Sequence, residues 1–290
     1  MSDSMLNKLR ALILCLGSFL MVIMMQIGIM SVFNLVCTFF LGEGVLNNPV
    51  VNALRYIVYA VVLSVFLGFF YKNFVNEGSK YKEDYGKEVG ATGITDFIKQ
   101  CVLLVVLGIS MQAFVYGLLN FVYTMMPDSE MLQSYGKLID NINGSSTIII
   151  FIYTMIFGPI VEELAFRGII MGYAGRAFDI GWSIVIQAAC FGLFHGNMIQ
   201  GLYAFVLGCI LGYVKYISGS MIKTILLHCV VNISGIFVVP VVAVLLSQLM
   251  ESIAAYVAIA IISGGLLVIC YYNRHVLKRG GTYGINQGDK

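Results

Sequence analysis

Three apolar stretches of this 290-residue chain contain polar side chains that could carry out acid–base chemistry. Carboxylates and imidazoles can accept or donate protons, while arginine and amide groups can stabilise negative charge. Ionisable groups inside a membrane cost about 2.5–3.5 kcal/mol each on insertion scales and usually mark function. We therefore take six residues as the candidate catalytic set. They are Glu162, Glu163, Arg167, His195, His228 and Asn232.

The spacing of these residues predicts which of them can interact. Glu163 and Arg167 are four positions apart, so on a helix they can form an ion pair along one face. Glu162 is rotated by about 100° from its neighbour and can address a different partner. His228 and Asn232 are also four apart, so both can point into one cavity. With His195 from a further segment, three helices would bring the set to one layer.

The elements that position this set must be membrane helices. Hydrophobic residues make up 59% of the chain, charged residues 11%, and the mean hydropathy is +0.90. A soluble domain carries roughly 25% charged residues. A chain so poor in charge has no polar shell to meet water, and it shows no nucleotide-binding glycine loop or basic tract for nucleic acid. All seven cysteines lie in apolar stretches without a CxxC pair, which indicates buried thiols.

A bilayer crossing needs roughly 20 mostly apolar residues, and the chain contains eight such segments. They span about 11–41, 53–71, 97–125, 147–171, 182–198, 201–217, 221–246 and 252–272. The first run is too long for a cleavable signal peptide and is read as an uncleaved span. The fifth and sixth are short, and Pro240 should kink the seventh. The prediction is an all-α transmembrane bundle forming a single domain, 1–290, with a catalytic core at 147–235.

The distribution of basic residues predicts the orientation. With the N-terminus in the cytoplasm, fourteen of the 17 Lys and Arg residues fall on the cytoplasmic side, many of them in the 72–96 linker. Only Arg55 and Lys137 fall outside, and Arg167 is intramembrane. The positive-inside rule then favours a cell-membrane protein with both termini cytoplasmic. The 126–146 linker is read as a polar loop on the outer side.

The three polar segments resemble the family of CAAX prenyl proteases and bacteriocin-processing enzymes (CPBP, or Abi, family). That family's signature is EExxxR, then FxxxH, then HxxxN, in this order on separate spans. The chain has Glu162-Glu163 with Arg167, Phe191 with His195, and His228 with Asn232. A Pro three residues before the first Glu and a Phe-Arg-Gly sequence are also similar. The resemblance covers about residues 147–235.

The resemblance implies an intramembrane endopeptidase without a serine or cysteine nucleophile. By analogy, Glu162 activates a water molecule with help from His195, and Arg167 supports Glu163. His228 and Asn232 donate hydrogen bonds to the oxyanion. No cofactor is then required. Zinc held by Glu162, His195 and His228 is the alternative, because one Glu and two His can form a catalytic zinc site.

Other functions stay open at this point. Each polar residue could be a structural contact between helices, and a proton or ion pathway could also use such groups. A non-catalytic immunity or interaction protein could share the same fold, since some family members are linked to bacteriocin self-immunity. For the peptidase, the expected partners are the lipid bilayer and a membrane-associated peptide or protein substrate. Neither the substrate's identity nor the oligomeric state follows from the sequence.

Overall fold

The computed structural model describes residues 3–75, 94–144 and 148–277, and every regular element in these ranges is helical. The first half of the chain forms α1 (Asp3–Leu41), η1 (Val45–Asn47), α2 (Pro49–Phe70), η2 (Tyr71–Val75), α3 (Ile94–Met125) and α4 (Glu130–Gly144). The next segments are α5 (Ile148–Ile152), η4 (Tyr153–Phe157), α6 (Gly158–Glu162), η5 (Glu163–Ile170) and α7 (Met171–Ala174). The remaining elements are α8 (Ile180–Phe194), α9 (Met198–Ser218), α10 (Met221–Ile233), η6 (Ser234–Val238), α11 (Val239–Ser247), α12 (Ser252–Tyr272) and η7 (Arg274–Leu277).

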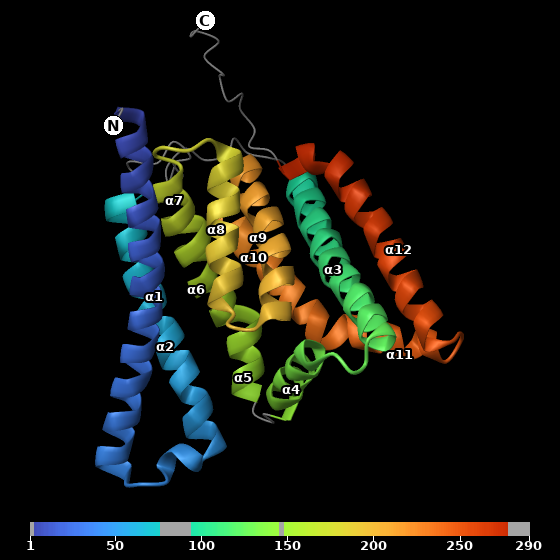
Figure 1. The fold of residues 1–290 in the computed structure, drawn as a ribbon, viewed down its shortest axis with the longest axis horizontal. Helices are drawn as coiled ribbons and strands as arrows, with labels where there is room; N and C mark the ends of the chain where they lie inside the picture. Colours follow the sequence, from blue (N-terminus) through green and yellow to red (C-terminus); the bar gives the residue numbers. More distant parts are fainter. Residues whose placement is uncertain (1–2, 76–93, 145–147, 278–290) are drawn as a thin grey trace, which may run out of the picture.

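The chain runs back and forth through one bundle, and α1 begins at the same end of it where α12 stops (Figure 1). Seven helices in the described ranges are long and apolar enough to cross a membrane. The predicted fifth span corresponds to α8, whose 15 residues fall short of that length. It runs antiparallel to α9, to which a short turn joins it (Figure 1). The polytopic helical bundle predicted from hydropathy is confirmed.

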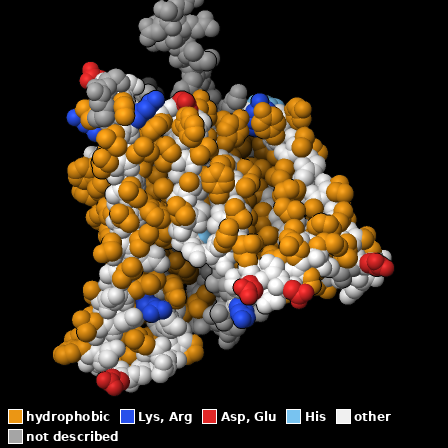
Figure 2. Space-filling view, in the orientation of Figure 1, with side chains coloured by type: hydrophobic (Ala, Val, Ile, Leu, Met, Phe, Trp, Pro, Cys, Tyr) orange, Lys and Arg blue, Asp and Glu red, His pale blue; other side chains and the backbone are white. Residues whose placement is uncertain are grey.

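Charged and apolar side chains occupy different levels of the surface along the direction of the helices. In Figure 2 the charged side chains gather toward the two ends, and hydrophobic side chains dominate the band between them. Many large apolar residues in this band are exposed, for example Val65 at 70% and Ile261 at 69%. Such a surface is stable against lipid chains and unstable against water.

The linker predicted as a loop at 126–146 is mostly helical. Residues Glu130–Gly144 form α4, which lies across one end of the bundle (Figure 1). Its Leu132 is buried, and Tyr135 packs against Tyr203 of α9 with ring centroids 6.1 Å apart. The loop prediction was wrong because the apolar residues of this segment lie on one helix face, which average polarity does not detect. Most of the 72–96 linker lies outside the described residues.

Two apolar clusters flank the segments that carry the candidate site. The first joins α1 and α2 to η5, with Tyr59 and Leu63 of α2 packed around Phe166 and Ile169. The second joins α3, α9, α10 and α12, with Met111 of α3 among its buried members. The polar residues therefore lie between two packed halves and are held from both sides.

Glycines allow α8 and α9 to pack closely together, and His195 lies at the end of α8. A Cβ atom added at Gly192 of α8 would lie 2.7 Å from the carbonyl oxygen of Gly201 in α9. Gly208 and Gly212 of α9 likewise face Ala188 and Gln187 of α8. The turn between the helices uses Gly196 at φ +67°, in the left-handed region that favours glycine.

Candidate active site

The predicted ion pair between Glu163 and Arg167 is present. Arg167 Nη1 lies 3.0 Å from Glu163 Oε1, and both side chains are fully buried. The segment that holds them, η5, is a π-helix, whose backbone bonds run from residue i to i+5. The guanidinium also lies over the ring of Phe191, 4.3 Å from its centroid. A buried charge needs such partners, because its desolvation is expensive.

A single imidazole connects the two adjacent carboxylates. His228 Nδ1 lies 2.8 Å from Glu163 Oε1, and its Nε2 lies 3.5 Å from Glu162 Oε2. Glu162 thus addresses a partner other than Arg167, as its position predicted, and that partner also contacts Glu163 through its other ring nitrogen. An ionised carboxylate can only accept, so Nδ1 is the donor in the short contact with Glu163. The other ring nitrogen, Nε2, faces Glu162.

The two carboxylates differ in their access to solvent and to a substrate. The side chain of Glu163 is 0% exposed and that of Glu162 is 18% exposed. Glu163 is held by a guanidinium and an imidazole, whereas the closest described partner of Glu162 is His228 Nε2 at 3.5 Å. Neighbouring carboxylates in unequal surroundings can take separate roles, one structural and one reactive.

His195 reaches this group through an aromatic ring. It caps the C-terminal end of α8, and its Nδ1 lies 2.8 Å from the carbonyl oxygen of Phe191. That oxygen can only accept, so Nδ1 carries the proton and Nε2 is left as the basic nitrogen. The Phe191 ring packs edge-on against both histidines, with centroids 4.7 Å from His195 and 5.7 Å from His228.

Asn232 lies one turn after His228 in α10, as its spacing predicted, but its amide has a partner. Nδ2 donates to the carbonyl oxygen of Thr154 at 2.8 Å. Thr154 belongs to η4, where the change from i+4 to i+5 bonding alters the backbone pattern of the helix. This contact uses one of the two N–H groups of the amide.

Polar caps fix the register of the helices that supply the histidines. Asp179 accepts a hydrogen bond from the backbone N–H of Trp182 at 3.0 Å and starts α8. Ser220 accepts one from Lys223 at 3.4 Å and starts α10 two turns before His228. Caps of this type typically contribute about 1 kcal/mol each.

Sequence reasoning missed the aromatic residues that surround the polar groups. Phe191 was noted as part of a motif, yet its ring lies between Arg167 and the two histidines. A Cβ at Gly158 would lie 3.8 Å from Glu162 Oε1 and 3.9 Å from Cζ of Tyr153, so glycine keeps the space beside the carboxylate open. The sequence signal that could have indicated these aromatic residues was the presence of several tyrosines in the apolar segments.

The donor atoms do not converge as metal ligands normally do. Within the part of the chain that the structure describes, no group of three or more His, Cys, Asp or Glu side chains is placed to hold a metal ion. Glu162 and His228 approach each other, while Phe191 packs against both His228 and His195.

The fold and the site together define a polytopic helical membrane protein with a buried carboxylate–imidazole–guanidinium cluster. Residues 144–234 match the family model described as type II CAAX prenyl endopeptidase, Rce1-like. This part of the chain is thus similar to the CAAX protease family, and all six candidate residues fall inside the matched range. No curated protein and no solved structure gave a significant match.

Proposed function

We propose that the protein is an intramembrane endopeptidase that hydrolyses a peptide bond in a membrane-associated peptide or protein. The observation that carries the proposal is the unequal pair of carboxylates. Glu163 is fully buried and paired with Arg167, whereas Glu162 is partly exposed and lies 3.5 Å from an imidazole nitrogen of His228. The match to a family of endopeptidases supports the same reaction class.

In the proposed reaction Glu162 removes a proton from a water molecule, and the resulting hydroxide adds to the peptide carbonyl carbon. His195 Nε2 accepts a hydrogen bond from the same water and orients it. The carbonyl electron pair moves to oxygen, and the oxyanion accepts hydrogen bonds from Asn232 and from His228 in its protonated form. Collapse of this intermediate breaks the C–N bond, and Glu162 returns the proton to the leaving amine.

Glu163 and Arg167 support the reaction without touching the substrate. The Glu163 carboxylate accepts from His228 Nδ1 at 2.8 Å, which orients the ring and stabilises its positive charge. Arg167 balances the charge of Glu163, so the layer tolerates a second carboxylate nearby. This arrangement keeps Glu162 available as the base.

A cleavage assay with a base-deficient variant tests the proposal. The protein is reconstituted in bilayers with a farnesylated peptide or an unmodified apolar peptide, and products are identified by mass spectrometry. Glu162→Gln should keep the fold and remove nearly all hydrolysis, because an amide cannot take a proton from water. The control is the unsubstituted chain, reconstituted in the same bilayers and compared at equal helicity. Retention of near-wild-type turnover by the variant would disprove the assignment of Glu162.

The same preparation tests the proposal that no cofactor is required. Elemental analysis should find no stoichiometric transition metal, and chelators should leave turnover unchanged. One zinc per chain, lost together with activity and restored on adding metal back, would instead move Glu162, His195 and His228 into a zinc site. If the intact protein binds peptides without cleaving them, the immunity or interaction role replaces the peptidase.

A further inference from the structure

An apolar cavity with its own set of lining residues runs along α9. Its volume is about 360 Å³, within the range of roughly 300–1,000 Å³ typical of small-molecule sites. None of the six candidate catalytic residues lines it. Its walls come from α3, α9, α12 and η7, and they include Leu103, Leu107, Ile210, Tyr213, Leu267 and Cys270.

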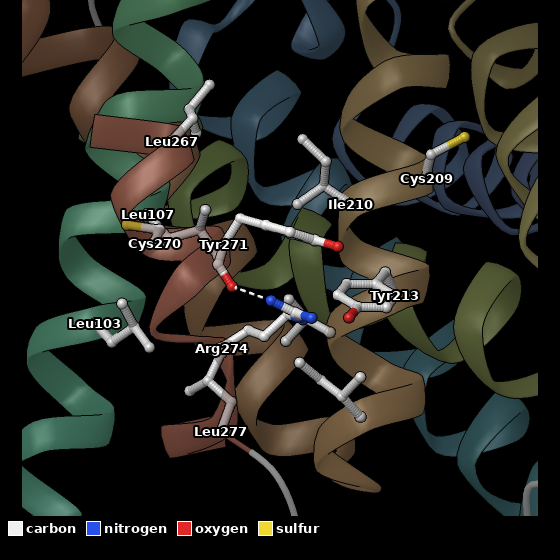
Figure 3. Close-up of a pocket in the computed structure, with 12 residues that line it drawn as sticks. Leu103, Leu107, Cys209, Ile210, Tyr213, Leu267, Cys270, Tyr271, Arg274 and Leu277 are labelled. Carbon is white, nitrogen blue, oxygen red and sulfur yellow. Dashed lines mark hydrogen bonds between the residues drawn. The ribbon is translucent and has the colours of Figure 1, made fainter. Parts of the chain in front are cut away.

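Among the described residues that line this cavity, Arg274 is the one charged side chain. Its side chain extends from η7 toward Tyr213 of α9, across the opening between the helices (Figure 3). One end of the guanidinium is fixed, because Nη1 donates to the carbonyl oxygen of Tyr271 at 2.7 Å and Cζ lies 3.9 Å from the Tyr271 ring centroid. Within the described residues, no carboxylate forms an ion pair with it.

The position of the cavity indicates what occupies it. Arg274 lies two residues after the end of α12, at the end of the bundle where α1 begins, so it sits where a span meets the headgroup region (Figure 1). The apolar walls extend from there alongside helices that face lipid. An occupant therefore needs an apolar chain at membrane depth and an anionic group at the interface.

We propose that this cavity binds the acyl chain of an anionic phospholipid, with Arg274 contacting the phosphate. Arginine and phosphate match in charge and in hydrogen-bond geometry. Basic pockets between membrane helices are known to bind acidic headgroups. The sequence directly after Leu277 continues with Lys278 and Arg279, which add positive charge.

Photochemical labelling tests this site. Wild-type protein in phosphatidylcholine nanodiscs receives a small fraction of phosphatidylglycerol with a diazirine on its acyl chain. Labelled peptides should map to the walls contributed by α3, α9 and α12. Arg274→Gln should lower the labelling about fivefold, the change expected for one basic contact worth about 1 kcal/mol. Arg274→Lys should keep most of it.

The matched control is Lys99→Gln, which removes a positive charge in α3, outside the cavity wall, that is already paired with Asp96 at 3.6 Å. Its labelling should equal that of wild type. Thermal unfolding of each variant in the same nanodiscs verifies folding, and higher salt should reduce labelling of the wild type. Equal labelling by a phosphatidylcholine probe, or no change in Arg274→Gln, would overturn the proposal. Competitive displacement by a farnesylated peptide would also overturn it, and would assign the cavity to lipidated substrates.

Discussion

The segments that carry the polar cluster differ from the pair formed by α3 and α12. Between Tyr153 and Ile170 the chain changes twice from α-helical to π-helical bonding, and α10 changes again directly after Ile233. In contrast, α3 and α12 are uninterrupted helices of 32 and 21 residues that pack along each other. Irregular helices thus hold the proposed chemistry, and regular helices form the adjacent support.

The contrast has a physical reason. A π-helical turn is less stable than an α-helical one and persists where other contacts compensate. Here those contacts are the Glu163–Arg167 pair and the hydrogen bond from Asn232 to Thr154. The α3–α12 pair has no polar layer of this kind, and it depends on close packing at Gly117. The two regions should therefore respond to different substitutions.

Arg167→Ala should have the largest effect, because it damages both the fold and the activity. It leaves the Glu163 carboxylate buried without its cation, a change that costs about 3–5 kcal/mol in buried pairs. Unfolding in mild detergent and peptide cleavage measure the two losses. The control is Lys99→Ala, whose pair with Asp96 is more than half exposed and should contribute little. Equal stability of the two variants would contradict the role of the buried pair.

Asn232→Ala should lower turnover about 10²–10³-fold, the loss typical of removing one oxyanion donor. Substrate binding should change little, because this hydrogen bond strengthens only as charge develops. Steady-state kinetics separates the two effects. Ser234→Ala is the control two residues away, since its hydroxyl donates only to the Val231 carbonyl within the same helix. A rise in KM with unchanged kcat would indicate that Asn232 only binds the substrate.

Gly117→Ala should lower the stability of the protein and leave its catalytic turnover unchanged. The added Cβ would lie 2.8 Å from the Tyr256 carbonyl oxygen and 2.9 Å from the Ala260 nitrogen, both backbone atoms of α12. Overpacking of this kind costs about 1–3 kcal/mol. Gly68→Ala is the control, because a Cβ there meets no described atom within 4 Å. Turnover per folded molecule should stay at the wild-type level, and a specific loss of turnover would show that the two regions are coupled.

The cysteine substitutions that test the orientation in the membrane should have the smallest effect on function. We propose that both termini and the 72–96 linker face the cytoplasm, because most Lys and Arg residues lie there. Ser134→Cys, in α4 at the opposite end, should react with an impermeant reagent added to sealed cells. Ser79→Cys, at a position outside the described residues, should react only after the cells are opened. Labelling of Ser79→Cys in sealed cells would contradict this orientation.

Much of the fold follows from hydropathy alone. Because lipid leaves backbone groups without partners, long apolar segments must be helices, and their ends were predicted within a few residues for α9 and α12. The break near Pro240 is confirmed, since η6 ends just before it. Segment α4 was missed because short amphipathic helices differ from loops in periodicity and not in composition.

The sequence by itself determined the polar set and one of its contacts, the pair between Glu163 and Arg167, because residues four apart on a helix meet wherever the helix lies. Only the tertiary structure decided that His228 bridges Glu163 and Glu162, that Phe191 packs against both histidines, and that Asn232 bonds to Thr154. These contacts join distant segments of the chain. Their geometry depends on helix packing and on π-helical turns, and spacing within one segment cannot specify either.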